Sequence, residues 1–136
     1  MNTSLIERSI EINASPDKVW RVFTDAAITR QMGGEYVSDW EVGSVFGWKG
    51  VDGRQYTHGE IMEVETSKRL KHKLFNGPDK SSVASEITYK FEGSGDTTVL
   101  FARERLFQSI SEEDYKEAVQ GWDTALYMVK QLAEGI

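Results

Sequence analysis

The sequence predicts an α+β fold, in which an antiparallel sheet of about six strands packs against one long helix at the C-terminal end. Two observations indicate this fold. Residues 111–134 place apolar side chains at helical spacing, and at about 1.5 Å per residue this helix would be roughly 35 Å long. Most of the chain between residues 43 and 107 alternates apolar and polar side chains, as half-buried strands do.

The C-terminal helix has one apolar stripe and a well-marked start. Six residues fall within one arc of about 80° when each residue advances by about 100°: Tyr115, Val119, Trp122, Leu126, Val129 and Ala133. Ser111 can accept a hydrogen bond from a free amide, and the acidic residues 112–114 suit the positive end of the helix. Gly121 indicates either a close neighbour or a glycine that is merely tolerated.

The N-terminal part predicts one strand followed by two short helices. Residues 5–13 alternate between apolar and polar side chains, which is typical of a half-buried strand. Ser15 and Pro16 then open the first helix, because proline is well tolerated at the first helical position. Asp25 caps a second short helix that ends near Gly33. These elements precede the main run of strands.

Turn residues divide the middle of the chain into antiparallel strands. Asp52-Gly53 is a strong hairpin signal, and as a two-residue loop it places Phe46 opposite Gly59. The same register puts Trp48 on the Phe46 face and His58 on the opposite one. The hairpin therefore predicts an aromatic inner face.

The next two strands extend that inner face. A turn at residues 65–68 places His72 opposite Ile61, and residues 76–82 form a loop. Ile87 and Tyr89 then lie on the apolar side of the following strand. An inner-face histidine is of interest because its charge can change near neutral pH.

The last strand, residues 97–107, is apolar on both faces and allows two registers. One register points inward the set Val99, Phe101, Arg103 and Arg105. The other points inward the set Leu100, Ala102, Glu104 and Leu106. We favour the first, because a five-residue turn pairs Phe101 with Tyr89. An inward Arg103 would need an acidic partner, water or an anionic ligand group.

Composition narrows the classes of function. The chain has 136 residues, a net charge of -6 and no cysteine. We expect one domain over residues 1–136, no nucleic-acid partner because no basic cluster is present, and no membrane span. Residues 1–4 lack the pattern of a signal peptide, so we expect a cytoplasmic protein, monomeric or homodimeric. We expect no catalytic residue, cofactor or metal. The pattern His58-x-Glu60 does not indicate a zinc site, because the chain lacks the cysteines of a zinc deaminase.

Motifs along most of the chain carry a resemblance to a known family. They are Ile12 to Trp20 with Phe23-Thr24-Asp25, Val42 to Phe46, Asp52-Gly53, Gly59-Glu60-Ile61 with Val64-Glu65, Arg69-Leu70, Thr97-Thr98-Val99 and Gly121-Trp122. In these the chain resembles the activators of the heat-shock chaperone ATPase, within the helix-grip (SRPBCC) superfamily of START lipid-transfer domains and birch-pollen allergens. The resemblance implies a curved sheet wrapped around the last helix with a cavity between them. It supplies no catalytic residue.

These inferences lead to a site and three functional hypotheses. We expect a small, mainly apolar ligand to be bound by the residues Phe46, Trp48, Ile61, His72, Ile87, Tyr89, Phe101, Arg103, Trp122 and Leu126. The resemblance implies a second hypothesis, a module that interacts with a chaperone or another protein, with a role in stress response. The third is an enzyme such as a cyclase or hydratase acting on an aromatic substrate, with His72 as its acid or base.

Overall fold

The computed structural model describes residues 5–76 and 82–136, so part of the loop predicted at 76–82, and the start of the chain, lie outside the described residues. It confirms an α+β fold with short helices early and one long helix at the end. In chain order the elements are β1 (Leu5–Ile12), α1 (Pro16–Thr24), α2 (Ala26–Thr29), η1 (Arg30–Met32), β2 (Gly34–Ser38), β3 (Val45–Gly50), β4 (Gly59–Glu65), β5 (Arg69–Phe75), β6 (Val83–Ser94), β7 (Thr97–Leu106) and α3 (Glu112–Glu134).

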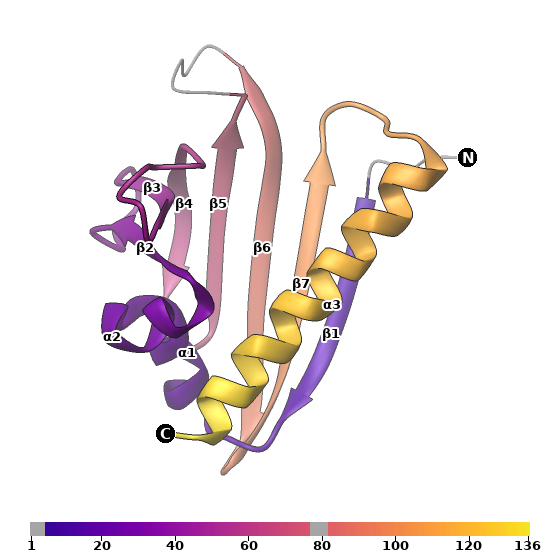
Figure 1. Ribbon diagram of the computed structural model, residues 1–136. Coiled ribbons are helices and arrows are strands. Elements are labelled where there is room, and N and C mark those ends of the chain that lie inside the picture. Colours follow the sequence, from indigo (N-terminus) through magenta and orange to yellow (C-terminus); the bar gives the residue numbers. More distant parts are fainter. Residues whose placement is uncertain (1–4, 77–81) are drawn as a thin grey trace.

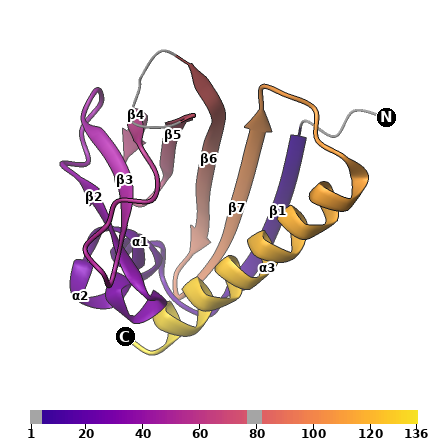
Figure 2. The ribbon, with the colours of Figure 1, turned by 45° about the horizontal axis from the view of Figure 1, so that its top comes forward.

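The strands form one antiparallel, curved sheet with the order β1-β7-β6-β5-β4-β3-β2. The sheet has seven strands rather than about six, because β2 was not predicted. Figure 2 shows α3 lying along β7 and β1, with β2 and β3 rising on the opposite side of the curved sheet. We call the face toward α3 the inner face.

Both predicted helix starts at Ser15 and Ser111 are confirmed. The Ser15 side chain accepts from the amide of Lys18, with Pro16 at the first helical position. The Ser111 hydroxyl accepts from the amide of Asp114 at 3.1 Å. These caps satisfy amide groups that would otherwise lack a partner at the helix N-termini.

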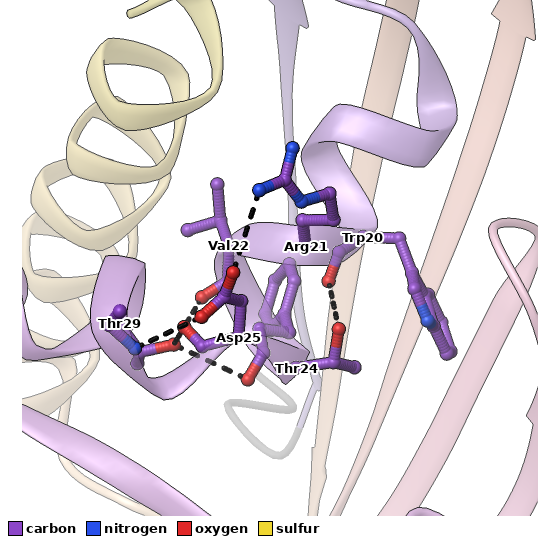
Figure 3. A network of polar contacts seen from close by, with 8 residues as sticks. Trp20, Arg21, Val22, Thr24, Asp25 and Thr29 are labelled. Carbon is purple, nitrogen blue, oxygen red and sulfur yellow. Dashed lines mark hydrogen bonds and ion pairs between the residues drawn. The ribbon is translucent and has the colours of Figure 1, made fainter. Parts of the chain in front are cut away.

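A buried hydroxyl fixes the corner between α1 and α2. Thr29 is fully buried, and its Oγ1 donates to the carbonyl oxygens of Val22 and Asp25. Figure 3 shows this contact together with the ion pair between Arg21 and Asp25. The Asp25 side chain also caps α2 by accepting from the amide of Ala27. The corner is therefore held by side chains on both sides of the turn.

We expect Thr29→Val to lower the free energy of unfolding by about 1–3 kcal/mol, because it leaves buried carbonyl groups without their donor at nearly constant volume. Urea unfolding followed by circular dichroism measures the change. Thr66→Val, at an exposed position in the turn between β4 and β5, is the control and should change stability by less than about 0.5 kcal/mol. Equal effects of the two variants would contradict the assigned role of Thr29.

Two predicted pairings on the inner face are confirmed. Phe46 pairs with Gly59, and Ile61 pairs with His72. The loop between β3 and β4 is longer than predicted, since Lys49 forms a bridge with Gln55. The hairpin around Asp52-Gly53 nevertheless keeps the aromatic side of β3 on the inner face.

The favoured register of the last strand is wrong. Ser94 pairs with Thr97, so the turn contains only Gly95 and Asp96, and Gly95 has a φ of 63°. Glycine at the first position is typical of two-residue hairpin turns. Tyr89 therefore pairs with Ala102 instead of Phe101. A shift of one residue turns every side chain of a strand to the other face.

The corrected register agrees with the cost of burying charge. Leu100 and Ala102 are buried on the inner face, whereas Arg103 and Arg105 are exposed on the outer face. The guanidinium groups of Arg103 and Arg105 therefore remain hydrated, and neither needs a buried partner. The charged side chain that β7 directs to the inner face is Glu104.

Polar contacts fasten α3 to the first strand. Arg8, which shares the apolar face of β1, forms a two-pronged ion pair with Asp123, with distances of 2.7 and 2.9 Å. Near the other end, Lys130 donates to the carbonyl of Glu11 and Glu134 accepts from the amide of Asn13. Because these bonds join α3 to β1 and to the residue after it, the helix lies over the β1 side of the sheet and away from β2 and β3.

Candidate ligand-binding groove

An open groove of about 560 Å³ lies between α3 and the β2–β3 edge of the sheet. This volume falls within the usual range of small-molecule sites, about 300–1,000 Å³. Its lining residues come from two walls and are Met32, Tyr36, Trp48, Glu117, Gln120, Gly121, Thr124, Ala125 and Met128. The elements that carry most of these residues, β2, β3 and α3, are labelled in Figure 1.

Aromatic rings build the wall on the sheet side. The rings of Tyr36 and Trp48 meet edge to face, with centroids 5.0 Å apart. Trp48 also lies over Gly34, where an added Cβ would come within 2.7 Å of the indole. Gly34 thus leaves room for this indole, and Trp48 forms this part of the wall.

The helix wall is formed by the face of α3 opposite to its apolar stripe. The lining positions between 117 and 128 follow helical spacing and therefore share one face. Gly121 lies in the middle, and a Cβ added there would meet no atom within 4 Å. The close neighbour considered for Gly121 is therefore absent, and the glycine contributes free space to the groove.

An aromatic array continues from the groove into the core. Tyr36 packs against Phe46 at 5.1 Å, Phe46 stacks on His72 at 3.9 Å, and Tyr89 meets Trp122 edge to face at 5.8 Å. Side chains thus fill the inner face over β4 to β7, and the open space lies beside β2 and β3. The predicted cavity is displaced to one edge of the sheet.

The structure separates the predicted site residues into three groups. Trp48 alone of the ten lines the groove. Seven lie in the core or pack against it, namely Phe46, Ile61, His72, Ile87, Tyr89, Trp122 and Leu126. Phe101 and Arg103 are exposed on the outer face, so their predicted inward orientation is wrong. They line a separate depression of about 820 Å³ on that face.

One polar contact and two phenol groups with raised pKa values lie in the interior next to the groove. Trp122 donates from Nε1 to the Glu104 carboxylate at 2.9 Å. Burial raises the pKa of Tyr36 to about 12 and that of Tyr89 well above its usual range. Both phenols therefore stay neutral, and Tyr36 joins the groove wall to the polar interior.

His72 is a neutral core residue. It is only 2% exposed, its Nδ1 has no hydrogen-bond partner among the residues that the structure describes, and burial lowers its pKa to about 3. Stacking on Phe46 separates it from the residues that line the groove. The hypothesis of an enzyme requires His72 to exchange protons with the bound molecule. In this position His72 is not placed to do so with a molecule in the groove.

Within residues 5–76 and 82–136, no group of three or more acidic or histidine side chains could hold a metal ion. Among the helices of that same part of the chain, none combines the length and apolar character needed to span a membrane.

The curved sheet, the long C-terminal helix and the groove between them define a helix-grip protein. The chain belongs to the family described as activator of Hsp90 ATPase homolog 1-like proteins, whose model matches residues 13–134. This confirms the resemblance found in the sequence motifs. A comparison with curated proteins gives no significant match.

Solved structures share the fold at low sequence identity. Protein MLL2253 from Mesorhizobium loti is 21% identical, with a TM-score of 0.76 over 94% of this chain and 95% of that one. The Aha1 dimer from Colwellia psychrerythraea is 17% identical, with a TM-score of 0.77 over 96% of each chain. CalU16 from Micromonospora echinospora is 23% identical, with a TM-score of 0.73 over 95% of this chain and 75% of that one. Identities this low support the fold alone.

Proposed function

We propose that the protein binds a small, mainly apolar molecule in the groove between α3 and the β2–β3 edge, without catalysing a reaction. The observation that carries this proposal is the combination of Tyr36 and Trp48 on one wall with the free space at Gly121 on the other. Concave sites with aromatic walls and a few polar groups are typical of small-molecule binding.

The helix-grip fold supports this proposal because it is compatible with ligand binding. The groove also has a rigid support, since Tyr36 packs against Phe46 and Phe23 of the core. A preformed wall lowers the entropy that binding would otherwise cost. The polar side chains Gln120 and Thr124 on the helix wall can orient a ligand.

Native mass spectrometry and thermal shifts with fatty acids, sterols and aromatic polyketides test the proposal. We expect at least one class to bind and to raise the melting temperature. Trp48→Ala should reduce that shift by at least half, because it removes the larger aromatic surface of the groove. Phe101→Ala, an aromatic truncation on the outer face, should keep it. If no class binds the wild type, or if only Phe101→Ala loses the shift, the proposal is wrong.

A second candidate function is protein interaction, which the family relationship favours. On the outer face, Phe101 is 38% exposed within the larger depression, beside Arg103 and Lys90. An exposed aromatic residue among charges is a common feature of interaction sites. A partner such as a chaperone would then contact this face rather than the groove.

A pull-down with the host chaperone separates the two functions. If the interaction function holds, Phe101→Ala weakens capture and Trp48→Ala does not. If Trp48→Ala weakens capture and Phe101→Ala does not, the partner binds at the groove. Absence of capture by the wild type would exclude the chaperone as the partner.

A further inference from the structure

The charge of the groove restricts the class of molecule that it can hold. Glu117 is the one charged residue among the groove's described lining residues, and no lysine, arginine or histidine lines it. Arg103, for which an anionic ligand group was one of several possible partners, lies on the other face of the sheet. An anionic head group would therefore meet a carboxylate and no cation.

The Glu117 carboxylate is available to a ligand. No hydrogen bond or ion pair engages its side chain within residues 5–76 and 82–136. It lies one helical turn before Gly121, on the same face of α3 and therefore beside the free space. The carboxylate can therefore pair with an incoming group, because none of the described residues forms an ion pair or hydrogen bond with it.

The opposite wall also favours positive charge. Tyr36 and Trp48 meet edge to face and both line the groove. The Tyr36 ring is stacked against Phe23 in the core, so Trp48 is the ring of this wall that can attract a cation, and tryptophan does so most strongly among the aromatic residues. The remaining contacts, from Met32 and Met128, suit an apolar body because methionine side chains are flexible and polarisable.

We infer that the groove selects an apolar molecule that carries an organic cation, an amine or a quaternary ammonium, with the cation beside Glu117 and the aromatic wall and the apolar body along Met32 and Met128. This inference rests on the proposed binding function and adds the chemical class of the ligand. It differs from the anionic ligand group that was one of the alternatives for an inward Arg103.

Three probes of equal chain length test the inference: decyltrimethylammonium, decanol and decanoate, each titrated at low salt below its micelle concentration and followed by tryptophan fluorescence. We expect decyltrimethylammonium to bind at least three times more tightly than decanol, and decanoate to bind most weakly. Glu117→Gln should weaken decyltrimethylammonium about three- to fivefold and leave decanol unchanged. Glu113→Gln, which removes the same charge in the first turn of α3 away from the groove lining, should leave both probes unchanged.

The outcomes separate the inference from the function on which it rests. The cation preference would be overturned if decanoate bound as tightly as decyltrimethylammonium, or if Glu117→Gln and Glu113→Gln had equal effects. In either case, binding of decanol would still support the groove as a ligand-binding site. Failure of all three probes to bind the wild type would overturn both.

Discussion

Replacing Gly121 by leucine will weaken decanol binding at least tenfold, whereas replacing it by alanine will leave the binding within about twofold. Gly121 contributes open space to the groove, and an added Cβ meets no atom within 4 Å. Alanine therefore fits, and it should raise the free energy of unfolding by about 0.5–1 kcal/mol through its better helix propensity. A leucine side chain extends into the space between Gly121 and the aromatic wall, so it competes with the ligand. Fluorescence titration and urea unfolding measure the two effects.

Gln131→Leu is the matched control for this prediction. Position 131 is exposed on α3 and does not line the groove. Leucine there adds the same apolar surface to the same helix and should leave decanol affinity unchanged. Undiminished binding by Gly121→Leu would show that decanol binds elsewhere.

His72→Phe will flatten the dependence of stability on pH between pH 6.5 and 4.5. Burial lowers the pKa of His72 from 6.5 to about 3. Between these values the unfolded chain binds a proton that the folded protein does not, so the free energy of unfolding falls as pH is lowered. The slope is up to about 1.4 kcal/mol per pH unit, and the wild type should lose about 2–3 kcal/mol more than the variant over this window.

Urea unfolding at pH 7.5, 6.5, 5.5 and 4.5 measures this difference. At pH 7.5 the variant should be about as stable as the wild type or more so, because phenylalanine keeps the stacking on Phe46 and removes a buried Nδ1 that no described residue partners. His58→Phe, at the other histidine of the chain, should keep the slope of the wild type. Parallel curves for the wild type and His72→Phe would contradict the buried, neutral state of His72.

Local signals in the sequence determined much of the fold. The caps at Ser15, Asp25 and Ser111 and the apolar stripe of the last helix depend on neighbours within a few residues. Pairings such as that between His72 and Ile61 follow from short turns between strands of clear alternation. These features were predictable because each rests on one local rule.

The facing of β7 was not predictable by alternation, because both of its faces carry apolar residues. The decision rested on the turn, where Gly95 with its positive φ forms a two-residue loop. The observed register is favoured by the free-energy cost of burial, because burying Arg103 and Arg105 costs far more than burying Leu100 and Ala102. The extra strand β2 was missed because its five residues, Gly34–Ser38, alternate too briefly to give a signal.

Most of the groove was missed for a related reason. Its helix wall consists of the polar face of α3, which a sequence pattern assigns to solvent. Tyr36 lies on the unpredicted strand, so the aromatic wall was only half identified through Trp48. The one available signal was Gly121, whose cost in a helix interior implies a purpose, although the free space it provides is visible only in three dimensions.

The most direct test of the binding groove is a nitrogen–proton NMR titration of the wild-type protein with decanol. Our account predicts that the largest chemical-shift changes occur at the indole N–H of Trp48 and at the backbone amides of Gly121 and Thr124, which lie on the two walls. Amides of Thr88 and Arg103, in the outer depression, should stay unchanged. Changes centred on Thr88 and Arg103, or no change at Trp48 and Gly121 at saturating decanol, would contradict it.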